Sequence, residues 1–146
     1  MRCLALVCLA ALLALSVPES HAQTYEPQRG SSGRSAILDI ARSEVRESGL
    51  RGSVRFYGVW MRRSGDWAFM KAEIRRPDGG YIFDSDPDYC DADAMIEILL
   101  RRQGNSWRVI SGDGSETQYC VSDFAGYNWY VENYGAPRSI LPPSPY

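Results

Sequence analysis

The sequence predicts an α+β domain: an N-terminal helix packed on a four- to five-stranded antiparallel meander sheet, with a short C-terminal helix. Three observations carry this prediction. Apolar residues recur at helical spacing near the start of the domain, short segments of alternating polarity follow, and Gly-rich turns separate these segments. A helix followed by a run of hairpin-linked strands is typical of the α+β class.

The predicted helix covers residues 35–48, with Ser35 as its N-cap and Gly49 as the residue that ends it. A single apolar stripe runs along it, formed by Ile37, Ile40, Ala41 and Val45. The opposite face is charged, and we interpret it as solvated. The helix is therefore expected to cover one face of the sheet.

Four strands are predicted, at residues 53–62, 67–75, 94–102 and 107–110, with a brief continuation of the sheet at 81–83. Turns are expected at residues 63–66, 77–80 and 103–106 because Gly and Asp concentrate there. In the second strand, Ala68, Met70, Ala72 and Ile74 alternate with polar and aromatic residues. In the first strand, Val54, Phe56 and Trp60 are expected on one face, with Gly58 between them.

An aromatic-rich helix is expected over residues 123–133, capped by Ser122 and ended by Gly135 and Pro137. Five aromatic residues crowd around it: Phe124, Tyr127, Trp129, Tyr130 and Tyr134. Aromatic side chains with polar tips are favoured at interfaces, so Tyr127, Trp129, Tyr130 and Tyr134 form a candidate binding surface. The alternative is that these rings cover the open end of the sheet as core.

Residues 1–22 have the layout of a secretory signal peptide, with Arg2, an apolar run, and small residues before a cleavage site after Ala22. The apolar run is shorter than the roughly 20 residues that a spanning helix needs, so no membrane span is expected after cleavage. We therefore predict a secreted or periplasmic protein. Its remaining parts are a flexible leader at 23–33, one domain at 34–140, and an extended tail at 141–146.

Cleavage would remove His21, the only histidine, and leave the net charge at −2 because Arg2 and Glu19 cancel. This charge gives no global attraction toward nucleic acid, so no nucleic-acid partner is expected. Without histidine, Ser-His-Asp and Cys-His mechanisms are excluded, and structural zinc lacks ligands. No phosphate-binding glycine motif occurs, and no cofactor is expected.

Cys90 and Cys120 would be the two cysteines of the mature chain, since Cys3 and Cys8 leave with the signal peptide. A secreted chain with two cysteines usually pairs them, so a disulfide between Cys90 and Cys120 is expected. A free thiol is the alternative, and it would lack a histidine to activate it.

The aspartate-rich segment at residues 83–95 (FDSDPDYCDADAM) is interpreted as a solvated loop. A standard EF-hand is excluded because Tyr89 and Met95 stand where that loop needs Gly and a bidentate Glu. The alternative is a non-standard calcium site that would use Asp84, Asp86, Asp88, Asp91 and Asp93. No other metal site is predicted.

Three arginine pairs lie beside the predicted turns, at Arg62-Arg63, Arg75-Arg76 and Arg101-Arg102. They could form a basic patch for a phosphate or an acidic partner. The alternative is that they are solubilising charges at the ends of strands.

The order of elements resembles the cystatin/NTF2-like group of small folds, which hosts unrelated activities. Five short segments also resemble a set of small secreted bacterial proteins of unassigned function. They are GDWAF at 65–69, RPDGG at 76–80, LLRR at 99–102, WRVI at 107–110 and YGAP at 134–137. The resemblance spans about residues 34–140 and implies a shared fold without bringing catalytic residues.

Two functions remain open at this point. The first is a secreted, non-catalytic binding or interaction module of the cell envelope or exterior, with an unknown protein or envelope ligand as its partner. The second is a small cofactor-free enzyme, isomerase- or hydrolase-like, which would use Tyr57, Asp66 and Tyr81 in an NTF2-like hollow. A buried Asp facing a pocket would favour the enzyme, and exposed aromatics on a shallow surface would favour the binding module.

Overall fold

A computed structural model describes residues 22–47, 51–81, 95–110 and 127–143 of the chain. Its elements are α1 (Ser32–Glu47), β1 (Arg55–Ser64), β2 (Trp67–Arg75), β3 (Met95–Gln103), β4 (Ser106–Val109), α2 (Asn128–Tyr134) and the 3₁₀ turn η1 (Arg138–Ile140). The four strands form one antiparallel sheet in the order β1-β2-β3-β4. The predicted α+β class and meander are therefore confirmed.

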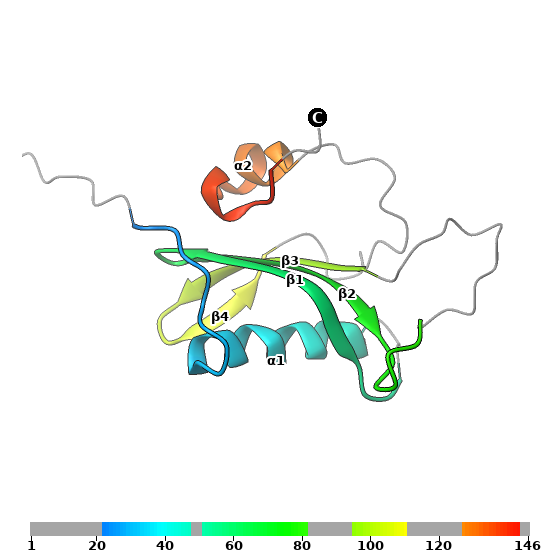
Figure 1. The fold of residues 1–146 in the computed structure, drawn as a ribbon. Coiled ribbons are helices and arrows are strands. Elements are labelled where there is room, and N and C mark those ends of the chain that lie inside the picture. The colour runs from blue at the N-terminus through cyan, green and yellow to red at the C-terminus, as the bar shows by residue number, and fades with distance from the viewer. Residues whose placement is uncertain (1–21, 48–50, 82–94, 111–126, 144–146) are drawn as a thin grey trace, which may run out of the picture.

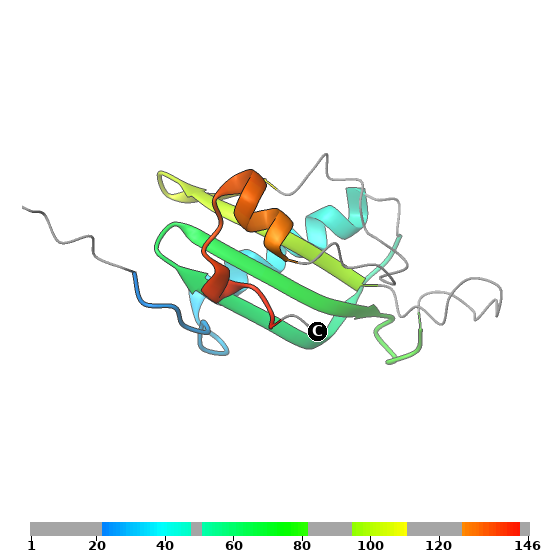
Figure 2. The same cartoon turned by 90° about the horizontal axis from the view of Figure 1, so that it is seen from above.

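Helical elements lie on both faces of the sheet (Figure 1). α1 runs along one face, and α2 with η1 lies on the other. Seen from the α2 side, η1 lies over β1 and β2, and α2 crosses the sheet beside it (Figure 2). The sheet therefore separates two apolar cores, one under α1 and one under α2.

α1 begins at Ser32, earlier than predicted, because Ser31 rather than Ser35 caps it. The Arg34 amide donates a hydrogen bond to Ser31 Oγ at 3.2 Å, and Ser31 Oγ donates to the Gln28 carbonyl at 2.8 Å. This is the bonding expected of an N-cap serine. The predicted apolar stripe is confirmed, since Ile37, Ala41 and Val45 are fully buried and Ile40 packs beside them.

The core under α1 is built from inward-facing residues of β1, β2 and β3. Its strand members are Met61, Ala68, Met70, Ala72, Ile74, Ile96, Ile98 and Leu100. Successive side chains of a strand point to opposite faces, so the alternation predicted for β2, which β3 also has, follows from the pleat. The intervening residues of the same strands face α2.

β1 departs from this alternation at Gly58. Its register on β2 shifts by one residue between Tyr57 and Trp60, and Gly58 has a φ of +57°. Glycine adopts this left-handed conformation at little cost, and the resulting β-bulge moves the following side chains to the other face. Phe56 therefore packs in the α1 core and Trp60 in the α2 core. The prediction that they share a face is wrong.

Two-residue turns connect β1 to β2 and β3 to β4, inside the predicted turn regions. Gly65 has a φ of +54° and Gly104 a φ of +60°, whereas Asp66 and Asn105 have negative φ values. A positive φ at the first central residue only is the pattern of a type II′ hairpin turn, which matches the twist of the flanking strands.

The segment predicted as a flexible leader contacts the outer edge of β1. Tyr25 and Arg63 exchange two backbone hydrogen bonds of 2.9 Å. Glu26 forms ion pairs of 3.3 Å with Arg34 and 3.4 Å with Arg62. These contacts extend the sheet edge by a short bridge, which nothing in the composition of residues 23–33 indicated.

Several predictions concern parts of the chain outside the described residues. They are the signal peptide up to residue 21, the end of the first helix at Gly49, the aspartate-rich segment, the Cys90–Cys120 disulfide, and the Ser122 cap. Among the residues that the structure places, no helix is long and apolar enough to span a membrane.

Candidate binding surface around the C-terminal helix

The sheet face opposite α1 carries the second apolar core. Phe69 and Leu99 are fully buried at its centre, and Tyr127, Ala136, Ile140 and Leu141 cover them. The indole Nε1 of Trp60 donates a 3.0 Å hydrogen bond to the Ile140 carbonyl, which ties η1 to β1. The C-terminal segment is therefore held against β2 and β3 by burial and by a directional bond.

α2 covers the later part of the predicted helix, whose first residues lie outside the described part of the chain, and it ends where predicted. Gly135 follows it with a φ of +68°, and its amide donates to the Val131 carbonyl at 2.9 Å. Glycine is favoured at such a left-handed C-terminal position. The turn sends the chain back across the sheet through buried Ala136, so that α2 and η1 lie side by side over the same face (Figure 2).

The four candidate binding residues have different environments. Tyr127 is buried at 4% exposure, Tyr130 and Tyr134 are half-buried, and Trp129 is exposed at 44%. Tyr127 and Tyr130 each meet the ring of Phe69 at a centroid distance of 5.7 Å. The two interpretations of these aromatics therefore apply to different residues: Tyr127 belongs to the core, and Trp129 faces outward.

The exposed ring of Trp129 is held by its neighbours. Its centroid lies 5.5 Å from Tyr130 and 5.2 Å from Tyr134, and both contacts are edge-to-face. Such aromatic pairs contribute about 0.5–1.5 kcal/mol beyond their buried area. A side chain that is already ordered loses little freedom when it binds. α2 thus presents an ordered aromatic side chain to solvent.

A polar cluster that no sequence pattern indicated lies beneath the start of α2. Lys71 Nζ is 2.7 Å from Glu97 Oε1, across the β2–β3 pair. Lys71 also donates to the Tyr127 hydroxyl at 3.0 Å, and this hydroxyl donates to Glu97 Oε1 at 3.3 Å. The side chains of Lys71 and Glu97 are only 21% and 17% exposed. The cluster fixes Tyr127, and through it the start of α2.

Two facts could have pointed to this cluster. Lys71 is the only lysine of the chain, beside 15 arginines. It also stands in the middle of the aromatic face of β2. Its partner depends on the register of β2 against β3, which the sequence did not specify. Burial, the charge of Glu97 and the hydrogen bond to it raise the pKa of the Tyr127 phenol above its ordinary value of 10, while the charge of Arg138 opposes them.

We expect the folded state to lose stability as the pH rises above about 10, and Tyr127→Phe to remove part of this loss. The folded state holds the phenolic proton more tightly than the unfolded chain. The contribution is therefore complete below the unfolded pKa of about 10 and is lost as the pH rises toward the folded pKa. Urea unfolding between about pH 8 and pH 11 measures the slope. Tyr134→Phe is the control, and equal slopes for both variants would contradict the assignment.

Comparison with known proteins identifies no family for this chain. No family model, curated protein or solved structure matches the chain. The resemblances to cystatin/NTF2-like folds and to small secreted bacterial proteins therefore stay predictions. The function has to be inferred from the surface itself.

Of the three residues considered for catalysis, Tyr57 and Tyr81 come together and Asp66 does not. Tyr57 and Tyr81 flank the Arg75 guanidinium at centroid distances of 5.2 and 4.6 Å. Asp66 lies in the turn at the opposite end of β2. All three candidates are exposed. Within the described ranges, no group of three or more His, Cys, Asp or Glu side chains could hold a metal ion.

Two of the predicted arginine pairs are divided between the two faces of the sheet, because neighbouring residues of a strand point in opposite directions. Arg62 stacks on Trp60 at 4.9 Å, on the α2 side, whereas Arg63 stacks on Trp107 at 4.7 Å, on the α1 side. Arg101 stacks on Trp67 at 5.0 Å, also on the α2 side. Basic surfaces therefore arise from pairing between strands and not from neighbouring residues along one strand.

Proposed function

We propose that the protein is a secreted, non-catalytic binding module whose contact surface is the outward side of α2. The observation that supports this most is the Trp129 ring, which is 44% exposed and is fixed between Tyr130 and Tyr134. Trp and Tyr are enriched among the residues that dominate binding energies at interfaces. An ordered, exposed tryptophan on a helix that is anchored to the core fits this role.

The packing under α2 favours binding at the surface over catalysis in a hollow. An NTF2-like enzyme would need a concave sheet face with room for a substrate. In the described part of the chain, Phe69, Leu99 and Ile140 fill the centre of the face opposite α1. The candidate catalytic residues Asp66 and Tyr81 lie at opposite ends of β2 instead of facing this region.

The proposed location follows from the N-terminal pattern, so the partner would be a protein or another ligand of the cell envelope or exterior. An outward surface suits such a role because it remains accessible when the domain is fully folded. The anchoring of α2 by the Lys71–Glu97–Tyr127 cluster would keep this surface in one arrangement.

Trp129→Ala is expected to abolish capture of the partner and to leave the domain folded. A hot-spot aromatic typically contributes about 2 kcal/mol or more, which corresponds to roughly a thirtyfold loss of affinity. The measurement is a cross-linked pull-down from extracts of the source cell's envelope and medium. Tyr81→Ala is the matched control because Tyr81 is even more exposed, at 53%, and lies at the far end of the sheet. Equal capture by both variants would contradict the proposed surface.

A further inference from the structure

We propose that the partner is an acidic polypeptide segment whose carboxylates bind Arg101 and Arg108, on the same side of the sheet as α2. This inference rests on the proposed function, and it names the class of partner for that surface. The observations behind it are the pairing of these two arginines across strands, the fact that neither forms an ion pair with another described residue, and the distribution of charge along the chain.

Arg101 and Arg108 are direct partners in the antiparallel β3–β4 pair, so their side chains lie on the same face. Both are exposed. The Arg101 guanidinium lies 5.0 Å from the centroid of Trp67, and Trp67 packs against the cluster that α2 covers. The two guanidinium groups are therefore on the α2 side, at the hairpin end of the sheet.

This juxtaposition is unfavourable unless an anion is present, because like charges directly opposite each other destabilise a strand pair. Among the described residues, neither Arg101 nor Arg108 forms an ion pair. The ion pairs of that part of the chain involve Arg34, Arg42, Arg62, Lys71, Arg75 and Arg76. Asp66 is in the adjacent turn, where its backbone carbonyl accepts from the Arg102 amide at 2.7 Å, and its carboxylate takes part in none of the ion pairs between described residues. The two facing guanidinium groups therefore have no counter-charge among the described residues.

The wider charge distribution favours a short acidic segment over a long polyanion. The described residues carry 15 Arg and Lys against nine Asp and Glu, a net charge of +6, whereas the whole chain has a net charge of −2. The negative net charge of the whole chain therefore gives no long-range attraction toward nucleic acid, whose binding depends on many phosphate contacts. A short peptide responds to the local charge alone.

The side-chain chemistry also fits a polypeptide. A guanidinium can bind a carboxylate through two parallel hydrogen bonds, which an ammonium group cannot do. Protein interfaces are enriched in Arg, Trp and Tyr and depleted in Lys. Here two arginines and Trp67 lie on the side of the sheet that also carries Trp129. The only lysine, Lys71, is used internally.

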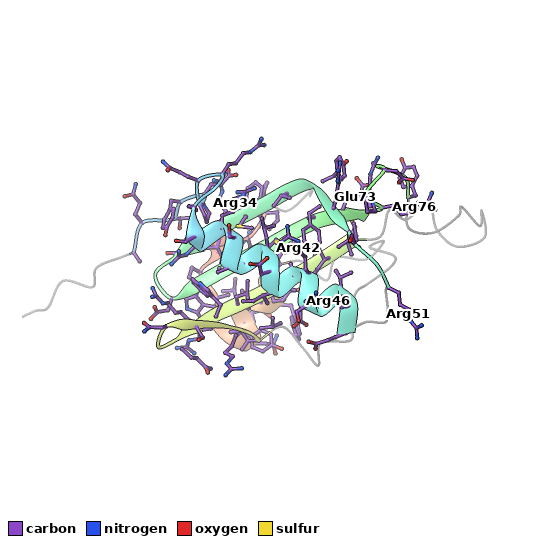
Figure 3. All side chains as sticks on the ribbon, turned by 90° about the horizontal axis from the view of Figure 1, so that it is seen from below. Arg34, Arg42, Arg46, Arg51, Glu73 and Arg76 are labelled. Atoms are coloured by element: carbon purple, nitrogen blue, oxygen red, sulfur yellow. The ribbon has the colours of Figure 1, made fainter. Side chains whose placement is uncertain are left out.

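The test measures binding of a fluorescein-labelled oligoglutamate of about six residues to the full-length protein by fluorescence anisotropy, at about 50 and 150 mM salt. We expect the double variant Arg101→Gln/Arg108→Gln to bind at least tenfold more weakly. The matched control is Arg46→Gln/Arg51→Gln, which removes the same amount of charge from two exposed arginines. Arg46 lies in the last turn of α1 and Arg51 follows that helix (Figure 3). The control is expected to change the affinity less than twofold.

Several outcomes would overturn the inference. They are no binding of oligoglutamate at the lower salt, an equal loss in the control variant, or tighter binding of a labelled oligothymidylate of the same length. Circular dichroism checks that every variant is folded. If Trp129→Ala abolishes the pull-down while Arg101→Gln/Arg108→Gln does not, the binding module stands and the acidic partner is excluded. If neither variant affects capture, the α2 surface itself is excluded.

Discussion

Phe69→Ala is expected to lower the free energy of unfolding by about 3–5 kcal/mol and to loosen α2 from the sheet. Phe69 is fully buried, and its ring makes edge-to-face contacts with Tyr127 and Tyr130, which belong to the C-terminal cover. Removing it leaves a cavity and deletes both aromatic contacts. Urea unfolding followed by circular dichroism measures the loss. Acrylamide quenching of tryptophan fluorescence reports how well this side of the sheet is covered, because three of the four tryptophans, Trp60, Trp67 and Trp129, lie there.

Phe56→Ala is the control for this substitution. Phe56 is the same residue type in the other core, but it is only partly buried and lies near the end of the sheet. We therefore expect a smaller loss of stability and no change in tryptophan quenching. Equal costs for the two variants would mean that the core under α2 contributes less to the fold than its burial indicates.

Glu97→Ala is expected to cost about 2 kcal/mol of folding free energy. Removing one member of a fully buried ion pair costs about 3–5 kcal/mol, because the remaining charge is desolvated without its counter-charge. Here the cost should be smaller, since Lys71 and Glu97 remain 21% and 17% exposed. The loss is measured by urea unfolding at neutral pH, and it should also weaken the hydrogen bonding of the Tyr127 hydroxyl.

Two further variants separate the contribution of charge from that of packing. Lys71→Met/Glu97→Met removes both charges together and is expected to recover most of the loss, since apolar replacement of a whole buried pair is often close to neutral. Asp39→Ala breaks the exposed pair between Asp39 and Arg42, and it should cost less than about 0.5 kcal/mol. A double variant as unstable as Glu97→Ala would show that the cost comes from packing and not from the charge.

Features that depend on local sequence were predictable. The apolar stripe of α1, the alternation in β2 and the Gly-rich turns each follow from a short-range pattern, and the structure has all three. The start of α1 was not predictable in the same way. Ser31 and Ser35 are both good caps, and the choice between them depends on the fold. In the structure, Ser31 caps the helix by accepting a hydrogen bond from the Arg34 amide. Arg34 is itself buried and forms an ion pair with Glu26, which precedes the helix.

Features that depend on strand pairing could not be predicted. The face of Trp60 depends on the bulge at Gly58, and a single inserted residue reverses every side chain that follows it. The Lys71–Glu97 pair and the Arg101–Arg108 pair both require a particular register, which no pattern within one strand encodes. The aromatic composition of the C-terminal segment pointed to the candidate surface, but it did not separate exposed Trp129 from buried Tyr127.

The sequence by itself determined the class of this fold, because hydrophobic periodicity and turn residues act over a few positions and decide which elements form. Only the tertiary structure decided which charged side chains meet and which aromatic rings remain exposed. These contacts join residues far apart in the chain, and their geometry depends on register, on a bulge and on the path of the chain after Gly135. The proposed binding surface belongs to this second group.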